Sequence, residues 1–150
     1  WNLGSSANYS DNETGNPSAW ITYEKSVQVM DGNPATYEGK LGLMSPSDYG
    51  YATSGGTTTN RETCVSTSLT EIGNYSDCIN NNWLYIPDKA QWLMIPSLSD
   101  AQNYFTINAS GSIGEQKSNV SVSDRPTAYL KNGLIIKGGN GTIGNPYKLN

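Results

Sequence analysis

The two cysteines are the residues for which the sequence leaves the fewest chemical roles. Cys64 and Cys78 lie fourteen positions apart and are the only cysteines in the chain. The residues between them are mostly polar, which favours a surface disulfide over a redox-active pair, with two free thiols as the alternative. A disulfide here would stabilise the fold by roughly 3 kcal/mol in the chain-entropy model. It would also indicate an exported protein.

Histidine is absent from the whole sequence. Its absence excludes Ser-His-Asp and Cys-His catalysis and removes the most common general base near neutral pH. With two cysteines and no histidine, a four-ligand zinc site of these two residue types is excluded as well. We therefore expect no catalytic residues, no metal and no cofactor, and the sequence predicts a protein that is not an enzyme.

Paired carboxylates could support glycoside hydrolysis or, with further oxygen ligands, calcium binding. The candidates are Glu24, Glu38, Asp48, Asp88, Asp100 and Asp124. Nothing in their spacing singles out a pair, since Asp48 is expected to cap a helix and Asp124 to pair with Arg125. The Asp-Gly-Asn-Pro turn at residues 31–34 and the Pro87-Asp88 pair fall short of a calcium loop. A carboxylate-based hydrolase is thus the least favoured function.

Three aromatic residues, Trp83, Tyr85 and Trp92, form the candidate ligand-binding set. Such side chains combine a large apolar face with a polar tip, so they could form a platform on which sugar rings stack. The alternative places Trp92 in the core and leaves Trp83 half-buried. Arg125 is expected to be a buried partner of backbone carbonyls rather than a ligand contact.

Composition indicates one domain rich in strands and turns. The chain has 150 residues, of which 35% are hydrophobic, with ten Tyr and four Trp against one Phe. Sixteen Gly and seven Pro favour turns over long helices. The net charge of −4 and the lack of a Lys/Arg cluster make nucleic acid a poor partner. No apolar run is long enough to span a bilayer.

The strongest local signal is a strand that runs directly into a helix at residues 41–52. Ser45 is placed to cap the helix, and Asp48 can reach back to the Ser45 amide as in a capping box. Pro46 falls at the first helical position, where its missing N–H costs nothing. Ser45, Asp48 and Arg125 are therefore assigned structural roles.

The elements of the remaining chain are predicted from the alternation of residues along each stretch and from the positions of turn residues. Residues 1–18 form a polar N-terminal arm, residues 19–30 alternate like a β-strand, and residues 53–63 form an exposed loop. A short helix is expected around residues 69–72 and an apolar strand at 92–96. Residues 103–113 start a hairpin whose partner lies near 120–122. Residues 124–130 and 134–137 form a second hairpin around Asn132-Gly133.

These elements and motifs resemble the C-type-lectin-like fold in its bacterial forms. The residues that carry the resemblance are the helix start at 43–52, the Trp-Leu-Met-Ile-Pro-Ser strand at 92–97 and the Arg-Pro strand at 124–130. The resemblance implies an α+β fold of mostly antiparallel strands with one or two short helices, as a single domain over residues 19–150. The calcium signature of the lectins is absent.

A closer similarity is to surface proteins of Gram-positive gut bacteria that carry a pilin-like N-terminal hydrophobic helix. It rests on Asp-Tyr-Gly-Tyr-Ala at 48–52, Arg-Pro-Thr-Ala-Tyr-Leu-Lys at 125–131 and the closing motif at 140–149. The hydrophobic helix itself is absent from this sequence. Because the sequence opens on Trp1 rather than Met, we expect a processed fragment whose membrane anchor was removed upstream.

The resemblance implies a non-enzymatic, exported cell-surface domain for adhesion or ligand binding. Its expected partner is a glycan or a host surface protein. The alternative is a structural, pilin-like subunit that associates with its own copies in a surface filament. Both functions place the protein outside the cell.

Overall fold

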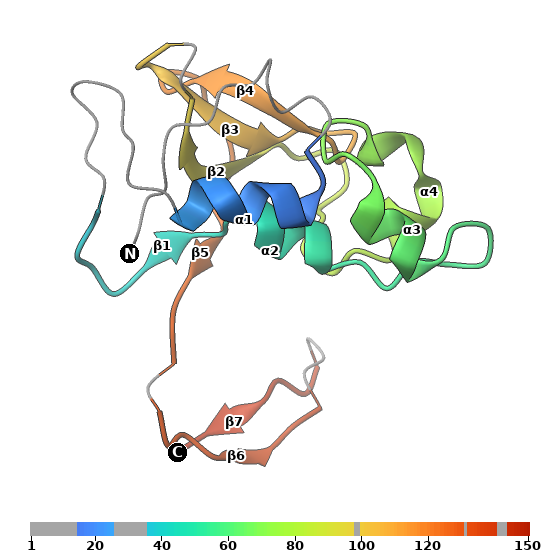
Figure 1. Cartoon of the computed structure of the whole chain (residues 1–150). Coiled ribbons are helices and arrows are strands. Elements are labelled where there is room, and N and C mark those ends of the chain that lie inside the picture. The colour runs from blue at the N-terminus through green and yellow to red at the C-terminus, as the bar shows by residue number, and fades with distance from the viewer. Residues whose placement is uncertain (1–14, 26–35, 98–99, 131, 141–143) are drawn as a thin grey trace.

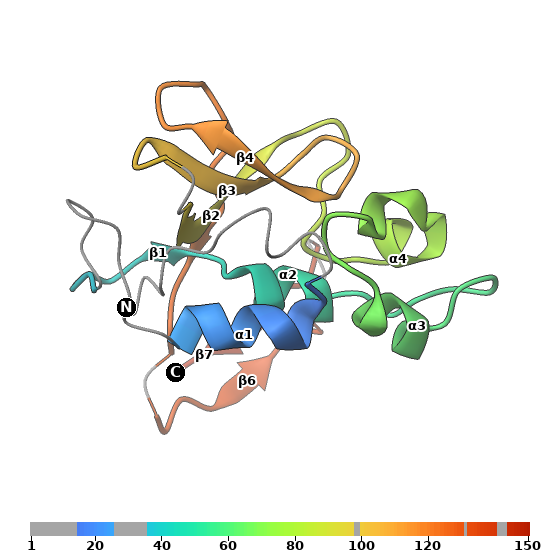
Figure 2. The same cartoon turned by 45° about the horizontal axis from the view of Figure 1, so that its top comes forward.

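A computed structural model describes residues 15–25, 36–97, 100–130, 132–140 and 144–150. The fold is α+β, with short helices and three antiparallel sheets. The strands pair in the order β2-β3-β4, with β1 against β5 and β6 against β7. Figures 1 and 2 show the three-stranded sheet on one side of helices α1 and α2, and α3 and α4 grouped together beyond α2. No helix among the described residues is long and apolar enough to cross a membrane.

Helix α1 spans Pro17–Lys25, where the alternation predicted a strand. The Asn16 side chain accepts the Ala19 N–H at 3.0 Å and so caps the helix start. Trp20 and Glu24 recur at helical spacing, and this face turns inward. The prediction of a strand was therefore wrong for the part up to Lys25, because the same residues also satisfy a period of 3.6. Residues 26–30 of that prediction lie outside the described residues.

The described part of the predicted N-terminal arm, residues 15–18, contributes to the packed domain. The Gly15 carbonyl accepts the indole N–H of Trp20 at 3.1 Å and the N–H of Leu69 at 3.0 Å. Pro17 is buried. Residues 1–14 of the arm lie outside the described residues.

The strand and capped helix at residues 41–52 are confirmed. Strand β1 spans Gly42–Leu43 and helix α2 spans Pro46–Tyr51. The Asp48 carboxylate accepts the N–H of Ser45 at 3.1 Å, which is the returning half of a capping box. Tyr49 and Gly50 are buried on the inner side of α2.

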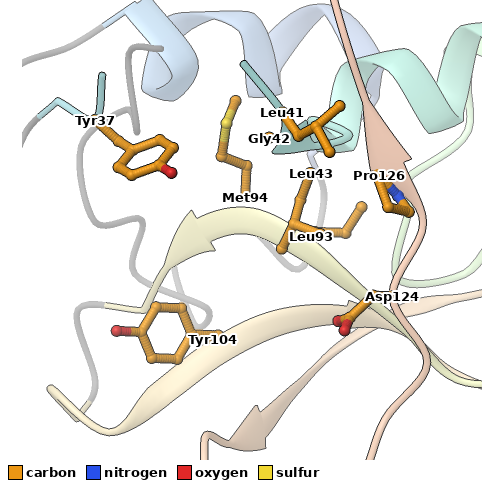
Figure 3. Close-up of a pocket in the computed structure, with 9 residues that line it drawn as sticks. All are labelled: Tyr37, Leu41, Gly42, Leu43, Leu93, Met94, Tyr104, Asp124 and Pro126. Atoms are coloured by element: carbon orange, nitrogen blue, oxygen red, sulfur yellow. The ribbon is translucent and has the colours of Figure 1, made fainter. Parts of the chain in front are cut away.

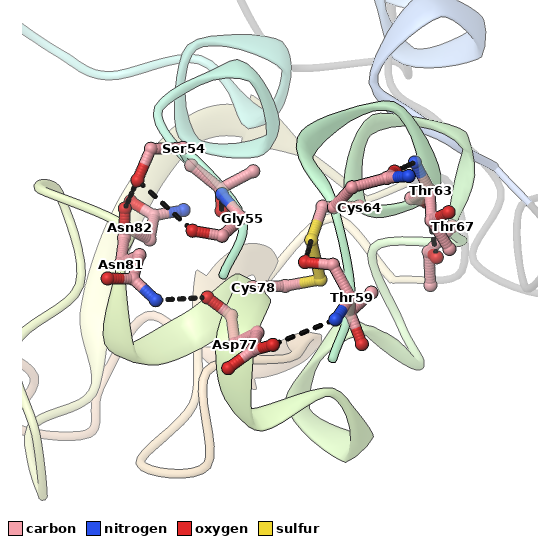
Figure 4. Close-up of a disulfide and its surroundings, with 12 residues drawn as sticks. Ser54, Gly55, Thr59, Thr63, Cys64, Thr67, Asp77, Cys78, Asn81 and Asn82 are labelled. Carbon is pink, nitrogen blue, oxygen red and sulfur yellow. Dashed lines mark hydrogen bonds between the residues drawn. A yellow bond between two sulfur atoms is a disulfide. The ribbon is translucent and has the colours of Figure 1, made fainter. Parts of the chain in front are cut away.

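A disulfide joins two short helices, α3 at Arg61–Ser66 and α4 at Ser76–Asn80. Cys64 and Cys78 are bonded to one another, as the sequence favoured, and Figure 4 shows the bond between the helices. Both cysteines are fully buried, so the expectation of a surface disulfide was wrong.

The predicted exposed loop over residues 53–63 ends earlier than expected. Asn60 accepts the N–H of Thr63 at 2.9 Å and starts helix α3 inside that stretch. The short helix expected around residues 69–72 begins later in the chain, as the 3-10 helix η2 at Ile72–Asn74.

The central sheet consists of β2 at Gln91–Pro96, β3 at Asn103–Ile107 and β4 at Ile113–Lys117. The predicted apolar strand is confirmed as β2. The predicted hairpin partner near residues 120–122 was wrong, because the chain turns back earlier. Asn108 accepts the N–H groups of Ser110 and Ser112 through its side-chain oxygen and closes a tight turn. Ile113 therefore already pairs with Ile107.

The late strands do not form the second predicted hairpin. Strand β5 at Pro126–Thr127 pairs with β1, and β6 at Ile136–Gly138 pairs with β7 at Lys148–Leu149. Gly133 has φ +88, in keeping with the expected turn. Figure 1 shows a length of extended chain after β5 that carries β6 and β7 away from the other sheets.

The hydrophobic core lies between α1, α2 and the three-stranded sheet. Trp20 is fully buried and packs edge-on against Phe105, with ring centroids 4.8 Å apart. The Tyr23 ring also packs against Trp20, with ring centroids 6.0 Å apart. Around these rings the buried core is mostly aliphatic, with Leu93, Ile95 and Ile107 contributed by the sheet.

Candidate functional site

The three aromatic residues of the predicted platform lie in three different settings. Trp83 is 74% exposed. Tyr85 is half-buried against the core, and its hydroxyl donates to the Ala109 carbonyl at 2.6 Å. Trp92 is half-buried on β2 and packs edge-on against Tyr104, with centroids 6.4 Å apart. Of the three, Trp83 presents the most open ring.

Trp83 is one wall of a pocket of about 290 Å³, called here the aromatic pocket. The pocket is lined by Met44, Asp48, Tyr51, Ala52, Trp83, Leu84 and Thr127. Asp48 and Tyr51 lie three positions apart on α2, so helical geometry places both side chains on one side of that helix. Thr127 arrives from β5, because β5 pairs with β1 in the register that sets Thr127 opposite Gly42.

The backbone beside Trp83 is fixed by hydrogen bonds to α2 and its neighbours. The Asn82 side chain donates to the Tyr49 carbonyl at 2.8 Å and accepts the Leu84 N–H at 2.9 Å. The Trp83 N–H donates to the Ala52 carbonyl at 3.4 Å. An exposed ring on a fixed backbone loses little conformational freedom when a ligand binds.

Arg125 holds the other side of the same loop. Its Nη1 donates to the Trp83 carbonyl at 3.4 Å. The expected role as a partner of backbone carbonyls is matched, although Arg125 is half-buried rather than buried. No ion pair joins Asp124 to Arg125 within the described part of the chain, contrary to the expectation.

Two polar groups of the aromatic pocket differ in how accessible they are. The Thr127 hydroxyl oxygen is buried and has no hydrogen-bond partner among the described residues. Asp48 is exposed and, within the same part of the chain, uses only Oδ2 in a hydrogen bond, to the Ser45 N–H. An accessible carboxylate oxygen and two exposed aromatic rings suit a ligand that has both hydroxyl groups and apolar faces.

A second cavity of about 420 Å³, called here the apolar pocket, opens between two pairs of strands (Figure 3). Its lining residues are Tyr37, Leu41, Gly42, Leu43, Leu93, Met94, Tyr104, Asp124 and Pro126. The Met94 N–H donates to the Met44 carbonyl at 3.1 Å, and this bond joins β2 to the chain just after β1. Asp124 is the only charged residue of that lining.

Two of the candidate carboxylates, Glu24 and Asp48, lie near enough to one another for the charge of Asp48 to add to the raised pKa of Glu24. Glu24 accepts both the N–H and the hydroxyl of Ser47, and burial raises the pKa of its carboxyl. Asp48 and Asp124 line different pockets. Across the described ranges, no group of three His, Cys, Asp or Glu side chains is arranged to hold a metal ion.

The Asp77 carboxylate, beside the disulfide, organises the loop before α3. It accepts the N–H and the hydroxyl of Thr58. It also accepts the N–H of Thr59, the contact that Figure 4 draws. The hydroxyl of Thr58 and the two N–H groups lower the pKa of Asp77. This role is structural.

Sequence reasoning identified Trp83 but missed Tyr51 and Thr127. The spacing of Asp48 and Tyr51 on a predicted helix was a usable signal for Tyr51. Thr127 had no local signal, because only the pairing of β5 with β1 brings it to the site.

Comparisons of the chain with protein-family models, curated proteins and solved structures find no match.

Proposed function

We propose that this protein is a non-enzymatic, exported cell-surface domain that binds a saccharide in the aromatic pocket. The observation that carries the proposal is the 74% exposed ring of Trp83, held on a fixed backbone beside the Asp48 carboxylate. An exposed tryptophan costs the free protein apolar hydration, which a stacked sugar face would relieve. The Asp48 carboxylate would then accept hydrogen bonds from the sugar hydroxyls.

The proposed export is supported by the disulfide. Disulfides persist in oxidising compartments and are rare in reducing ones. Cys64 and Cys78 link α3 to α4 within the folded core, which suits a permanent structural bond.

The proposed C-type-lectin-like fold is supported by the pairing of an early strand with a late one. β1 leads into capped helix α2, and β1 pairs with the Arg-Pro segment at β5. The proposed kinship with surface proteins of Gram-positive gut bacteria rests on the three sequence motifs alone. In that setting, adhesion to a glycan or to a glycosylated host surface protein would be the role of the domain.

A glycan array followed by calorimetric titration tests the proposed binding. We expect a saccharide to bind the wild-type protein and Trp83→Ala to weaken it by about tenfold or more, a loss of about 1.4 kcal/mol. Tyr75→Ala is the matched control, because Tyr75 is 37% exposed and does not line the pocket. Absence of binding by the folded wild-type protein, or equal loss in both variants, would reject the aromatic pocket as a saccharide site.

A second candidate function is a structural subunit that assembles with its own copies. One observation favours it: the large apolar side chains of the β6–β7 hairpin are exposed. This function does not require saccharide binding.

A further inference from the structure

The C-terminal segment 129–150 is the most exposed apolar part of the described chain. Its exposed large side chains are Tyr129, Leu130, Leu134, Ile135, Ile136, Tyr147 and Leu149, with exposures from 39% to 81%. Exposed apolar patches that are contiguous mark sites of protein interaction. The C-terminal segment thus carries the most exposed apolar side chains among the described residues.

Among the described elements, the β6–β7 hairpin is held mainly by the contacts between its own two strands. Ile136 pairs with Leu149 and Gly138 with Lys148, and the Ile135 N–H donates to the Asn150 side chain at 2.8 Å. An isolated two-stranded hairpin is marginally stable in water. Because successive side chains of an extended segment point to opposite faces, Ile135 and Ile136 make both faces of the hairpin apolar. Such a hairpin gains stability by inserting into an apolar cavity.

The apolar pocket is a cavity with complementary lining. Leu41, Leu43, Met94 and two tyrosines are among the residues that line it (Figure 3). Leu41 is 56% exposed at its edge. Pro126 of β5 is part of the wall, and from there the chain leads away to the hairpin (Figure 1). The hairpin therefore lies clear of the pocket of its own chain.

The C-terminal segment and the rest of the chain carry net charges of opposite sign. Residues 129–150 contain three lysines and no Asp or Glu, a side-chain charge of +3. Residues 1–128 hold the other six basic residues and all thirteen acidic ones, a charge of −7, which together give the total of −4. Lys137 and Lys148 lie on the hairpin, and Asp124 lines the pocket. Opposite charges of this kind steer one surface towards the other.

We propose that the C-terminal hairpin of one copy inserts into the apolar pocket of a second copy. This inference rests on the second candidate function only. The two surfaces are different parts of the chain, so the contact is heterologous. A row of joined copies then has one free hairpin at one end and one free pocket at the other. The copies therefore join head to tail into an open filament unless the rotation closes a ring.

Two exposed substitutions separate the two halves of the contact. Ile135→Asp places a charge on the hairpin, and Leu41→Asp places one at the pocket edge. Both side chains are more than half exposed, so neither change disturbs the core. Trp83→Ala is the control, since Trp83 lines the other pocket.

Sedimentation velocity at increasing protein concentration measures the assembly. We expect the wild-type chain and Trp83→Ala to form growing oligomers, and each aspartate variant alone to stay monomeric. A mixture of the two aspartate variants should form dimers and nothing larger, because one intact hairpin and one intact pocket remain. A monomeric wild-type chain, oligomers of either aspartate variant, or a monomeric mixture would overturn the proposal. Saccharide binding by Leu41→Asp, measured in a separate experiment, tests the aromatic pocket independently of assembly.

Discussion

The hydroxyl of Tyr49 donates to the carbonyl oxygen of Gly111 at 2.5 Å, across 62 positions of sequence. Tyr49 is fully buried on α2, and Gly111 lies in the turn between β3 and β4. The Tyr49 backbone carbonyl also accepts the side chain of Asn82 at 2.8 Å. One residue therefore ties the capped helix to both the central sheet and the loop that carries Trp83.

Removing this hydroxyl should destabilise the fold without changing its shape. Tyr49→Phe deletes the donor and leaves the Gly111 carbonyl unpaired in the interior, at a cost of about 1–3 kcal/mol. Burial raises the pKa of Tyr49, so the hydroxyl remains a neutral donor at ordinary pH. Urea denaturation measures the change, with Tyr51→Phe as control because Tyr51 is 40% exposed. Equal midpoints for the wild type and Tyr49→Phe would contradict the assignment.

The contact of Glu24 with Ser47 predicts a definite pH dependence. The Glu24 carboxylate accepts the Ser47 N–H at 2.8 Å and the Ser47 hydroxyl at 2.5 Å. Burial raises the pKa of this carboxyl above its ordinary 4.5, against the opposing effect of both Ser47 hydrogen bonds. Between 4.5 and the folded pKa, the folded state binds more protons than the unfolded chain. The contribution of Glu24 to the free energy of unfolding is therefore greatest below pH 4.5 and falls as pH rises through the folded pKa.

Glu24→Gln isolates this contribution. Gln keeps an oxygen that can accept the Ser47 N–H and carries no charge to desolvate. We expect the variant to gain stability relative to the wild type as the pH rises from about 4 to about 8. Urea midpoints across that range measure the difference, and Glu71→Gln, at an exposed position, should parallel the wild type. A constant difference between Glu24→Gln and the wild type would show that Glu24 does not titrate differently in the two states.

The disulfide should contribute about 3 kcal/mol to stability, because it closes a loop of 14 positions. Reduction is expected to lower the thermal midpoint by about 10 °C. Thermal unfolding with and without reductant measures this change, after thiol titration confirms that both cysteines are free. The midpoint of the double variant Cys64→Ala, Cys78→Ala must not respond to reductant. An unchanged midpoint in the fully reduced wild type would contradict a stabilising role.

Local features of the fold were predictable, and distant pairings were not. The cap formed by Ser45 and Asp48 needs only four residues of sequence, and two cysteines leave one intramolecular disulfide. Helix α1 was mistaken for a strand because its residues fit both an alternation and a period of 3.6, and the contact of Glu24 with Ser47, 23 positions away, gives no local signal. Strand β5 was paired with the wrong neighbour because the Asn132-Gly133 turn is a local signal, whereas its true partner β1 lies far back in the chain.

In the candidate site, too, local features were predictable and contacts between distant residues were not. Trp83 was identified from residue type alone. Tyr85 and Trp92 were grouped with it by closeness in sequence, but the hydroxyl of Tyr85 is held by Ala109 and the ring of Trp92 lies against Tyr104. Composition cannot show which aromatic residues share a pocket, because that depends on where the helix and the strands cross.

The close packing of α1 on α2 gives the last prediction. A methyl group at Gly50 would lie 2.3 Å from Cγ of Pro17 and 2.8 Å from Cδ2 of Leu69. Pro17 belongs to the rigid first turn of α1 and cannot move without displacing the helix that buries Trp20. Gly50→Ala should therefore destabilise the fold by about 1–3 kcal/mol. Urea denaturation followed by tryptophan fluorescence, to which Trp20 contributes together with the three other tryptophans, measures the change in stability.

Gly114→Ala is the matched control for this change, because nothing lies within 4 Å of a methyl group at that position. Gly114 sits in β4, where a side chain also reduces the freedom of the unfolded chain. The control should therefore unfold at the wild-type urea concentration or slightly above it. If Gly50→Ala behaves in the same way as Gly114→Ala, then α1 does not pack against α2 as closely as the contact of Pro17 with Gly50 requires.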